Sequence, residues 1–478
     1  MNQSLTDFAS KIFEEKYRFL PAQSRRITQP ELTSHLESIL GFSPEVAGFS
    51  MEGRPVHRLT WGDGPIRILM WSQMHGNEPT ATLALLDLWS LLHQYPDLPV
   101  IQSLRSSVTI RCIPMLNPDG AQRFQRRNAA GIDLNRDAGA LASSEARILK
   151  SEKDQFDPHW GFNLHDQNPR YTVGNTGKVA RISLLAPAFN LNRDNNEVRD
   201  RAKCLISRLA KELDRVAGPN HTGKYDDAFG SRCFGDNMQK WGVSTILIES
   251  GGDENPDKPF VRQLNLHLFL CSLVDIASGN WKNGSPEGYE AIPFNGPLLA
   301  DLKLTDLMVQ SAGSQTFKAD LAINMVPMEQ INGHERLVGL VADIGALHPL
   351  SAKVVVKGTP GVLRPGTSVQ LTGDESAEIL KNHLMNGAST FYYPEQAFDK
   401  VAGWVSVVPG TFCPVGSRHD HSTRFLNPGE RASFRIVEGD RPVQIVVNGL
   451  IVWTAEAGWE PVQGWWLPDG VKGLEVEL

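Results

Sequence analysis

The 478-residue chain is predicted to hold an α/β domain with a mostly parallel, mixed sheet flanked by helices, followed by a smaller, mainly β domain. Three observations predict this. Short apolar, β-branched runs alternate with helix-like segments over the first two-thirds; a stretch rich in Gly, Pro and Asn follows; and the last part consists of short strand-like runs separated by turn residues. We therefore divide the chain into residues 1–277, a linker at 278–297, and residues 298–478.

Four strands and two helices are expected in the first domain. The strand candidates are IRILMWSQM from Ile66, SVTIRCIPM from Ser107, WGFNLH from Trp160 and VSTILIES from Val243. TATLALLDLWSLLHQY opens directly after Pro79, as a helix start allows, and VRDRAKCLISRLAKELDRVA from Val198 has a helical apolar period.

The second domain is expected to be built from the runs RLVGLVADIG, AKVVVKG, TSVQLTG, WVSVVPG and PVQIVVNGLIVW, with one helix in DESAEILKNHLMNG. Residues 425–453 are similar to the closing strands of the small β domain that flanks amidohydrolase barrels, through Asp440, Pro442, Asn448 and Gly449. This short likeness implies a β fold and no activity, since any tight hairpin also uses Asn-Gly.

Composition excludes several classes of protein. A net charge of −7 and a pI of about 6.0 argue against nucleic-acid binding as the main function. The N-terminus does not have the pattern of a signal peptide, and no apolar run is judged long enough to cross a bilayer. The five cysteines are scattered, so neither a disulfide framework nor a cysteine zinc site is expected. We expect a cytoplasmic protein that binds neither nucleic acid nor membrane.

Polar residues follow the ends of all four predicted strands. His75 and Glu78 follow the first, the loop NPDGAQRFQRRNAAGIDLNRD follows the second, and His165 and Glu249 end the third and fourth. Because functional crevices lie at the carboxyl ends of parallel strands, these four segments are expected to converge.

His75, Glu78 and His165 together make the two-histidine, one-glutamate set of a catalytic zinc. Each residue also has an ordinary explanation. The histidines can be bonded to backbone, and Glu78 can favour the positive end of the helix that follows. Glu249 is harder to explain in this way, because a carboxylate at a buried strand end is costly without a partner.

HGNE, NPDG, RRN, DLNRD, NLHD and ILIESGG, in that order, resemble the zinc metallocarboxypeptidases over roughly residues 45–276. The resemblance implies a metallocarboxypeptidase-like fold and one zinc ion per chain, bound by His75, Glu78 and His165. It also implies that Glu249 is the general base that activates the metal-bound water.

The same resemblance implies roles for other residues. Arg126, in RRN, matches the arginine that supports the oxyanion, with Arg127 as the competitor. Asn135 and Arg136 match the pair that holds the terminal carboxylate of the substrate, for which a guanidinium provides a bidentate fork. Tyr225 matches the mobile tyrosine that closes over the substrate.

The sequence departs from the family in places. Asp166 and Gln167 follow His165 where digestive members carry Ser-Tyr, which makes Asp166 a candidate for orienting a ligand. The stretch between Glu78 and His165 is shorter than in the digestive enzymes, so the pocket walls are expected to differ.

Arg232 stands where the family lines the pocket for the terminal side chain. A cation on the floor of that pocket would favour an acidic terminal residue. The alternative is that Arg232 pairs with Asp226, Asp227 or Asp236 and faces solvent.

The sequence therefore predicts a zinc-dependent hydrolase that removes a C-terminal residue from a peptide or peptide-like conjugate. The alternatives are an N-acyl amino acid deacylase with the same zinc set and a non-catalytic peptide-binding protein. In the second domain, Cys413, His419 and His421 are metal-ligand candidates, though chance histidines in a polar loop explain them better. Trp459, Trp465 and Trp466 fit aromatic packing better than a stacking surface.

Overall fold

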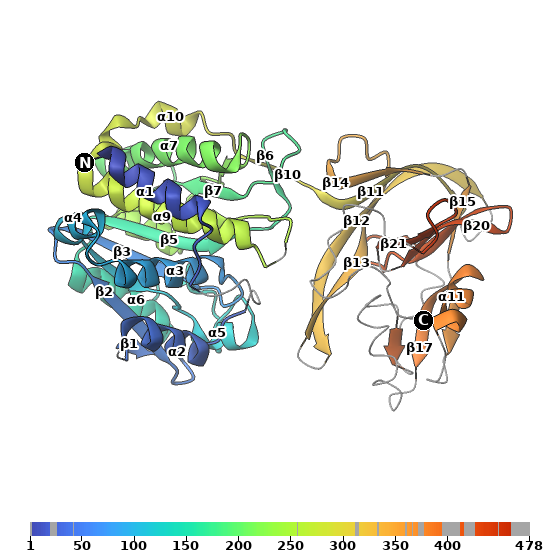
Figure 1. Ribbon diagram of the computed structural model, residues 1–478, viewed down its shortest axis with the longest axis horizontal. Helices are drawn as coiled ribbons and strands as arrows, with labels where there is room; N and C mark the ends of the chain where they lie inside the picture. The colour runs from blue at the N-terminus through green and yellow to red at the C-terminus, as the bar shows by residue number, and fades with distance from the viewer. Residues whose placement is uncertain are drawn as a thin grey trace. The chain divides into compact units, whose positions relative to one another are not determined.

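The computed structural model (Figure 1) divides into two compact units, residues 1–297 and 298–478, which are treated separately. It describes residues 2–19, 26–41, 43–255, 257–310, 315–331, 334–358, 361–365, 367–370, 377–393, 412–414, 426–447 and 449–459.

The first unit is built on an eight-stranded sheet in the order β1-β2-β4-β3-β5-β9-β7-β8. Its strands are β1 (Glu45–Phe49), β2 (Pro55–Trp61), β3 (Ile66–Ser72), β4 (Val108–Ile113), β5 (Trp160–Asp166), β7 (Ile182–Leu185), β8 (Thr222–Lys224) and β9 (Ser244–Ser250). The four predicted strands, β4, β3, β5 and β9, are neighbours and run parallel, whereas β1, β2 and β7 add antiparallel pairs. The predicted mixed, mostly parallel sheet is confirmed.

Helices cover both faces of this sheet. They are α1 (Asn2–Glu14), α2 (Gln29–Leu40), α3 (Thr80–Gln94), α4 (Pro99–Ser107), α5 (Pro118–Arg123), α6 (Ser144–Phe156), α7 (Glu197–Ala217), α8 (Phe234–Lys240), α9 (Pro259–Ser278) and α10 (Pro286–Glu290). Successive strand residues point to opposite faces, so Ile68 and Met70 join one buried cluster, mainly with α3, α7 and α9. Leu69 and Trp71 join the other, with α6 and α8.

Helix α9 corrects one expectation from the sequence. By length and composition its 20 residues are apolar enough to cross a membrane, although no such run was expected. Within the first unit, however, 89% of the most apolar 18-residue stretch of this helix is buried. Its polar residues are also bonded inside the unit, as Arg262 is to Asp87. In this structure α9 is therefore the central helix of a packed layer.

Residues 278–297, predicted to be a linker, lie within the first unit and contain a 3-10 helix, η2 (Asn280–Asn283), and α10. The phenol oxygen of buried Tyr289 accepts the Ala186 N–H at 3.3 Å. Asn295 Oδ1 accepts the Ser183 hydroxyl at 2.6 Å. These contacts tie the segment to β7, and the boundary between units follows Pro297.

The described part of the second unit is mainly β, as predicted. One sheet has the order β13-β12-β11-β15-β19-β20-β21, with β14 also pairing with β11, and β16-β17-β18 form a small sheet. Its elements are β11 (Ala300–Gln310), β12 (Thr316–Ile331), β13 (His334–Gly345), β14 (Ala352–Lys357), β15 (Val362–Pro365), β16 (Thr367–Gln370), α11 (Ala377–Met385), β17 (Ala388–Tyr393), β18 (Phe412–Pro414), β19 (Phe434–Glu438), β20 (Arg441–Val447) and β21 (Leu450–Thr454).

The segment that carries the amidohydrolase likeness forms consecutive antiparallel strands, β19, β20 and β21. Gly449, in the turn between β20 and β21, has φ 76°, which a glycine adopts without strain. Asn448 lies outside the described residues, as do His419, His421, Trp465 and Trp466. The ring of Trp459 lies 6.4 Å from that of Trp453, which agrees with aromatic packing.

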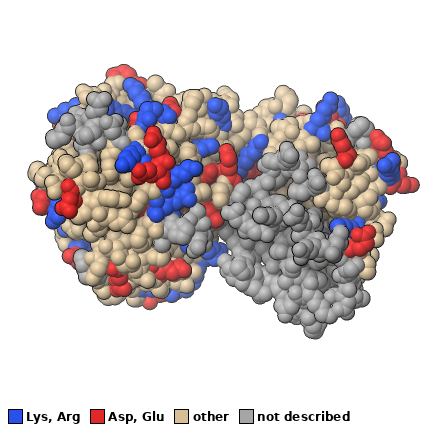
Figure 2. Space-filling model, in the orientation of Figure 1, with Lys and Arg blue, Asp and Glu red and all other residues tan. Residues whose placement is uncertain are grey.

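Charged residues are spread over the first unit. On the face drawn in Figure 2, Lys and Arg side chains lie in small groups among Asp and Glu side chains. This mixture reflects the near balance of 47 basic and 54 acidic residues in the chain.

Candidate metal centre

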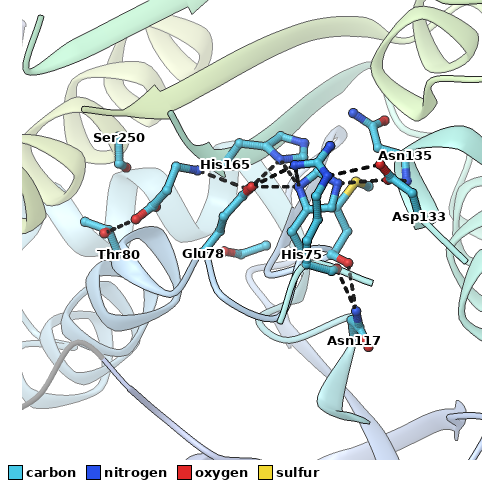
Figure 3. Close-up of polar contacts among 12 residues, drawn as sticks. His75, Glu78, Thr80, Asn117, Asp133, Asn135, His165 and Ser250 are labelled. Atoms are coloured by element: carbon cyan, nitrogen blue, oxygen red, sulfur yellow. Dashed lines mark hydrogen bonds and ion pairs between the residues drawn. The ribbon is translucent and has the colours of Figure 1, made fainter. Parts of the chain in front are cut away.

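The turn between β3 and α3 aims His75 and Glu78 into the molecule (Figure 3). Gln73 has a left-handed backbone, φ 49°, which bends the chain at the strand end. Gly76 packs against the backbone of α5, and a Cβ there would lie 2.0 Å from the carbonyl carbon of Gly120. The Glu78 N–H then bonds to the His75 carbonyl at 3.1 Å. The HGNE sequence therefore needs its glycine for a close approach of two backbone segments.

His75, Glu78 and His165 converge at one point, as the sequence predicts. Both Nδ1 atoms lie 2.8 Å from a Glu78 carboxylate oxygen, and the two Nδ1 atoms lie 3.2 Å apart. The three residues are at most 7% exposed. Figure 3 shows the three side chains pointing toward one another.

This arrangement fits a metal ion. Ring nitrogens and carboxylate oxygens that face one another need a proton or a cation between them. Zinc bonds of about 2.0–2.2 Å in a tetrahedron separate neighbouring ligand atoms by about 3.3 Å, close to the distances seen. The His165 Nε2 atom is buried and has no partner among the described residues, so the polar contacts of this ring are those of its Nδ1. Two histidines and one glutamate are a ligand set that zinc accepts.

Asp133 is a further residue of the centre that the sequence analysis did not identify. Its Oδ1 lies 3.0 Å from His75 Nε2, on the opposite side of the ring from Glu78. Oδ1 also accepts the Asn135 N–H at 2.9 Å, at the start of the 3-10 helix η1 (Leu134–Arg136). Metal-bound histidines commonly donate their second N–H to a carboxylate. The sequence offered one signal for Asp133: it lies in the loop that follows β4, the neighbour of β3 in the sheet.

Arg126, and not Arg127, reaches the metal ligands. Arg126 donates from one terminal nitrogen to His75 Nδ1 at 3.1 Å and to Glu78 Oε1 at 3.2 Å, and from Nε to Asp133 Oδ2 at 3.0 Å. Arg127 instead donates to the Gly131 carbonyl at 2.9 Å. Of the two candidates, only Arg126 lines the cavity that holds the ligand set.

That cavity has a volume of about 850 Å³. Its lining includes every site residue that the sequence predicted: His75, Glu78, Arg126, Asn135, Arg136, His165, Tyr225, Arg232 and Glu249. Segments far apart in the chain thus meet at one place, at the carboxyl ends of β3, β5 and β9.

Sheet register orders the cavity in two rows. His165 and Glu249 are paired across β5 and β9 and line the cavity, and Glu249 is paired in turn with Ser183 of β7. Glu249 is 6% exposed, and burial, together with the nearby Glu78 and Asp166 carboxylates, raises its pKa well above the usual range. A carboxyl group of raised pKa is well suited to accept a proton near neutral pH.

The second row lies two residues further into the sheet and consists of Asn163, Leu247 and Leu185. All three line the cavity. Asn163 is 2% exposed, and its Oδ1 has no partner among the described residues. Asn163 lies two positions before His165, so both side chains lie on one face of β5. This spacing could have identified Asn163 from the sequence.

The carboxylate-holding candidates lie beside α8. The Asn135 Oδ1 accepts the Phe234 N–H at 2.9 Å. Arg136 is exposed and donates to the Asn135 carbonyl at 2.8 Å. Tyr225 stacks edge-to-face with Tyr171 at 6.4 Å, and burial raises the pKa of its phenol.

Asp166 contacts the ligand Glu78 through its backbone and not through its carboxylate. Its backbone N–H donates to Glu78 Oε2 at 3.2 Å, while its carboxylate accepts from Thr80 Oγ1 at 2.5 Å and from Lys258 Nζ at 3.0 Å. The side chain therefore points away from the histidines. Asp166 orients Glu78 through its backbone, and Lys258 compensates the buried carboxylate.

Arg232 lines the cavity, as expected, and is exposed, unlike the buried Asn163 of the second row. The turn at 231–232 lies at the surface just before α8 begins, which carries Arg232 to the rim. In the part of the chain that the structure describes, Arg232 forms no ion pair. Asp227 pairs with Arg199 at 2.5 Å, whereas Asp226 and Asp236 accept backbone N–H groups.

Comparison with known proteins agrees with this geometry. Residues 42–177 match the zinc carboxypeptidase family. "Probable carboxypeptidase 2" of Arthroderma benhamiae is 30% identical over 155 residues, covering 31% of this chain and 28% of that protein. "Probable carboxypeptidase 2" of Trichophyton verrucosum is 29% identical over 216 residues, covering 43% and 38%. The chain thus spans about a third of the length of these relatives.

A metallo-carboxypeptidase structure from Burkholderia cenocepacia is similar with 18% identity and a TM-score of 0.44, covering 53% of this chain and 70% of that one. One from Pseudomonas aeruginosa, in complex with (2-guanidinoethylmercapto)succinic acid, has 20% identity and a TM-score of 0.41 over 53% and 70%. The match to the zinc carboxypeptidase family thus covers residues 42–177, which lie within the first unit.

Proposed function

We propose that this protein is a zinc-dependent carboxypeptidase that removes the C-terminal residue of a peptide or a peptide-like conjugate. One observation carries the proposal: the His75, Glu78 and His165 set lies in the same cavity as the buried Glu249 carboxylate and the exposed Arg136 guanidinium. One zinc ion is expected at this centre. The cytoplasmic location is a separate prediction from the sequence.

Substrate binding is assigned to Asn135 and Arg136. The Arg136 guanidinium is a planar fork that matches a terminal carboxylate, and Asn135 offers its amide beside it. A substrate anchored by its terminal carboxylate has its last peptide bond held near the metal ligands. Such anchoring makes removal of a terminal residue, and not cleavage within a chain, the expected reaction.

When bound, zinc lowers the pKa of a coordinated water and polarises the carbonyl group of the scissile bond. Glu249 takes the proton of the attacking water and passes it to the leaving amine as the C–N bond breaks, a role worth about two to four orders of magnitude in rate. Arg126 donates to the carbonyl oxygen as it gains charge, which requires its guanidinium to leave Glu78. Tyr225 is assigned to close over the bound substrate.

We further propose a preference for acidic terminal residues. The support is Arg232, a cation at the rim of the cavity that forms no ion pair with any described carboxylate. Replacing Arg232 by Asp and comparing peptides that end in Glu or Lys tests this. We expect the preference to move from Glu toward Lys; equal rates with both peptides before and after the change would remove this part of the proposal.

The central experiment measures zinc content of the purified protein and release of amino acids from a mixed peptide library. Glu249→Gln is expected to keep the zinc and to lose release by at least about a hundredfold. Glu197→Gln, an exposed glutamate at the start of α7, serves as the matched control.

Other outcomes would favour other functions. Glu249-dependent hydrolysis of N-acyl amino acids without release from peptides would favour a deacylase. Zinc with no Glu249-dependent hydrolysis of either substrate would favour a peptide-binding protein.

A further inference from the structure

A second group of metal-ligand side chains lies away from the cavity, between α7 and α9. It consists of Glu212 on α7 and of His267 and Cys271 on α9, with ligand atoms all within 4.8 Å of one another. His267 and Cys271 are one helical turn apart and are 1% and 9% exposed. None of the three residues lines the cavity of the first centre.

The hydrogen bonds of His267 fix which of its nitrogens carries a proton. Nδ1 lies 3.2 Å from the Ala9 carbonyl oxygen, which only accepts, so Nδ1 carries the hydrogen. In a neutral ring Nε2 then has a lone pair. That atom lies 3.0 Å from Glu212 Oε1, which is also an acceptor. Either a second ring proton or a cation must lie between them.

The position of Cys271 favours a cation. Its sulfur lies 3.6 Å from the same Nε2 atom, so this nitrogen has ligand atoms of two other residues close to it. Tetrahedral zinc, with bonds of about 2.0–2.2 Å to N or O and about 2.3 Å to S, separates N from O by about 3.3 Å and N from S by about 3.6 Å. The observed 3.0 and 3.6 Å agree as closely as do the distances in the first centre.

The charges around the cluster are compatible with a divalent ion. The Glu212 carboxylate pairs with Arg215, with the two groups 2.6 Å apart. Arg208 is neutralised by Asp275, with the two groups 2.7 Å apart. Arg215 is half-exposed and can move toward solvent. Binding would release the thiol proton of Cys271, so that carboxylate and thiolate balance the two charges of the metal.

We propose that Glu212, His267 and Cys271 bind a second divalent metal ion, most simply zinc, that is separate from the catalytic centre. The Ala9 carbonyl would orient the ligand histidine, as carbonyl groups do behind metal-bound imidazoles. Since Ala9 lies in α1, the ion would join α1, α7 and α9. Its role is structural: it holds the N-terminal helix on the core of the first unit.

Cobalt provides a test that does not depend on activity. The full chain is stripped of metal with a chelator and titrated with Co²⁺, and the near-ultraviolet region is followed for the charge-transfer band of cobalt bound to thiolate. The first centre has no sulfur ligand, and loss of the band in Cys271→Ser distinguishes the second site from Cys413, the other metal-ligand candidate of the chain. We expect the band in the wild type and in His165→Gln, and its loss in Cys271→Ser. Cys204→Ser, on α7 outside the cluster, is the matched control.

Metal analysis gives the second measurement. We expect about two zinc ions per wild-type chain and about one in either Cys271→Ser or His165→Gln. About one zinc per wild-type chain, together with no thiolate band, would overturn the proposal and leave a protonated His267 paired with Glu212. Because absence of the band in the wild type is decisive by itself, the test survives poor folding of a variant. Failure of the peptidase assay would leave this result unaffected.

Discussion

Asp133 Oδ1 lies 3.0 Å from Nε2 of His75 and thereby determines which nitrogen of that ring faces the metal centre. By accepting the Nε2 hydrogen, the carboxylate leaves the lone pair on Nδ1. The same oxygen holds the backbone N–H of Asn135. One carboxylate therefore links the metal ligands to the residues assigned to substrate binding.

Asp133→Asn is expected to weaken zinc binding about 10- to 100-fold, because a neutral amide orients and polarises the imidazole less than a carboxylate does. Competition with a chelator of known affinity measures this. Asp157→Asn, in an exposed pair with Arg67, should leave the affinity unchanged. An unaltered zinc affinity in the Asp133 variant would show that the contact does not act on the metal.

Gly76→Ala tests whether close backbone packing aims the ligands. The added Cβ would lie 2.0 Å from the carbonyl carbon of Gly120, so the turn must move. We expect lower zinc content and a free energy of unfolding reduced by about 1–3 kcal/mol, as overpacking costs elsewhere. Gly139→Ala, where the nearest atom is 4.0 Å away, is the control. Full zinc content with unchanged stability would contradict the role given to this glycine.

The buried ion pair of Arg262 and Asp87 joins α9 to α3, with N–O distances of 2.5 and 2.7 Å. Removing one partner leaves a buried charge, so Arg262→Met should reduce the free energy of unfolding by about 3–5 kcal/mol. Adding Asp87→Asn removes that charge and keeps an oxygen for the Phe19 N–H. Denaturant unfolding should therefore find the double variant more stable than the single one; the reverse order would refute this account.

Asp236 predicts a pH dependence of stability. Burial raises the pKa of this carboxyl to about 6, although the Gly230 N–H bond opposes the shift. The folded state thus binds its proton more tightly than the unfolded state, so the contribution is favourable below pH about 4 and is lost as the pH rises through about 6.

Asp236→Asn removes the loss of stability that deprotonation of Asp236 causes, and the asparagine can keep the bond to the Gly230 N–H. The variant should gain up to about 3 kcal/mol relative to the wild type at pH 7.5 and nothing at pH 4, measured by urea unfolding at both values. A difference between the two proteins that does not change with pH would exclude Asp236 as the titrating group.

Much of the centre could be predicted because its signals are local. His75, Glu78, His165 and Glu249 each follow or end an apolar run, and parallel strands place such ends together. The contact of Asp133 with His75 joins residues 58 positions apart and depends on how a loop folds back. The exposure of Arg232 could not be predicted, because a motif match does not reveal that its turn lies at the surface. The segment 278–297 looked like a linker in composition, yet its few apolar and polar anchors, such as Tyr289, bind it to the sheet.

The spacing of the two cross-strand rows sets a depth for the cavity. One strand step of two residues separates His165 from Asn163 and Glu249 from Leu247, a depth of about 6.6 Å. The backbone register fixes this depth of the cavity. Substitutions of side chains along the cavity walls change the width of the cavity and leave its depth unchanged. In the proposed function, the rise of the strands therefore limits the length of terminal side chain that fits, and only the chemistry at the far end, now the row of Asn163, Leu247 and Leu185, is left to side chains.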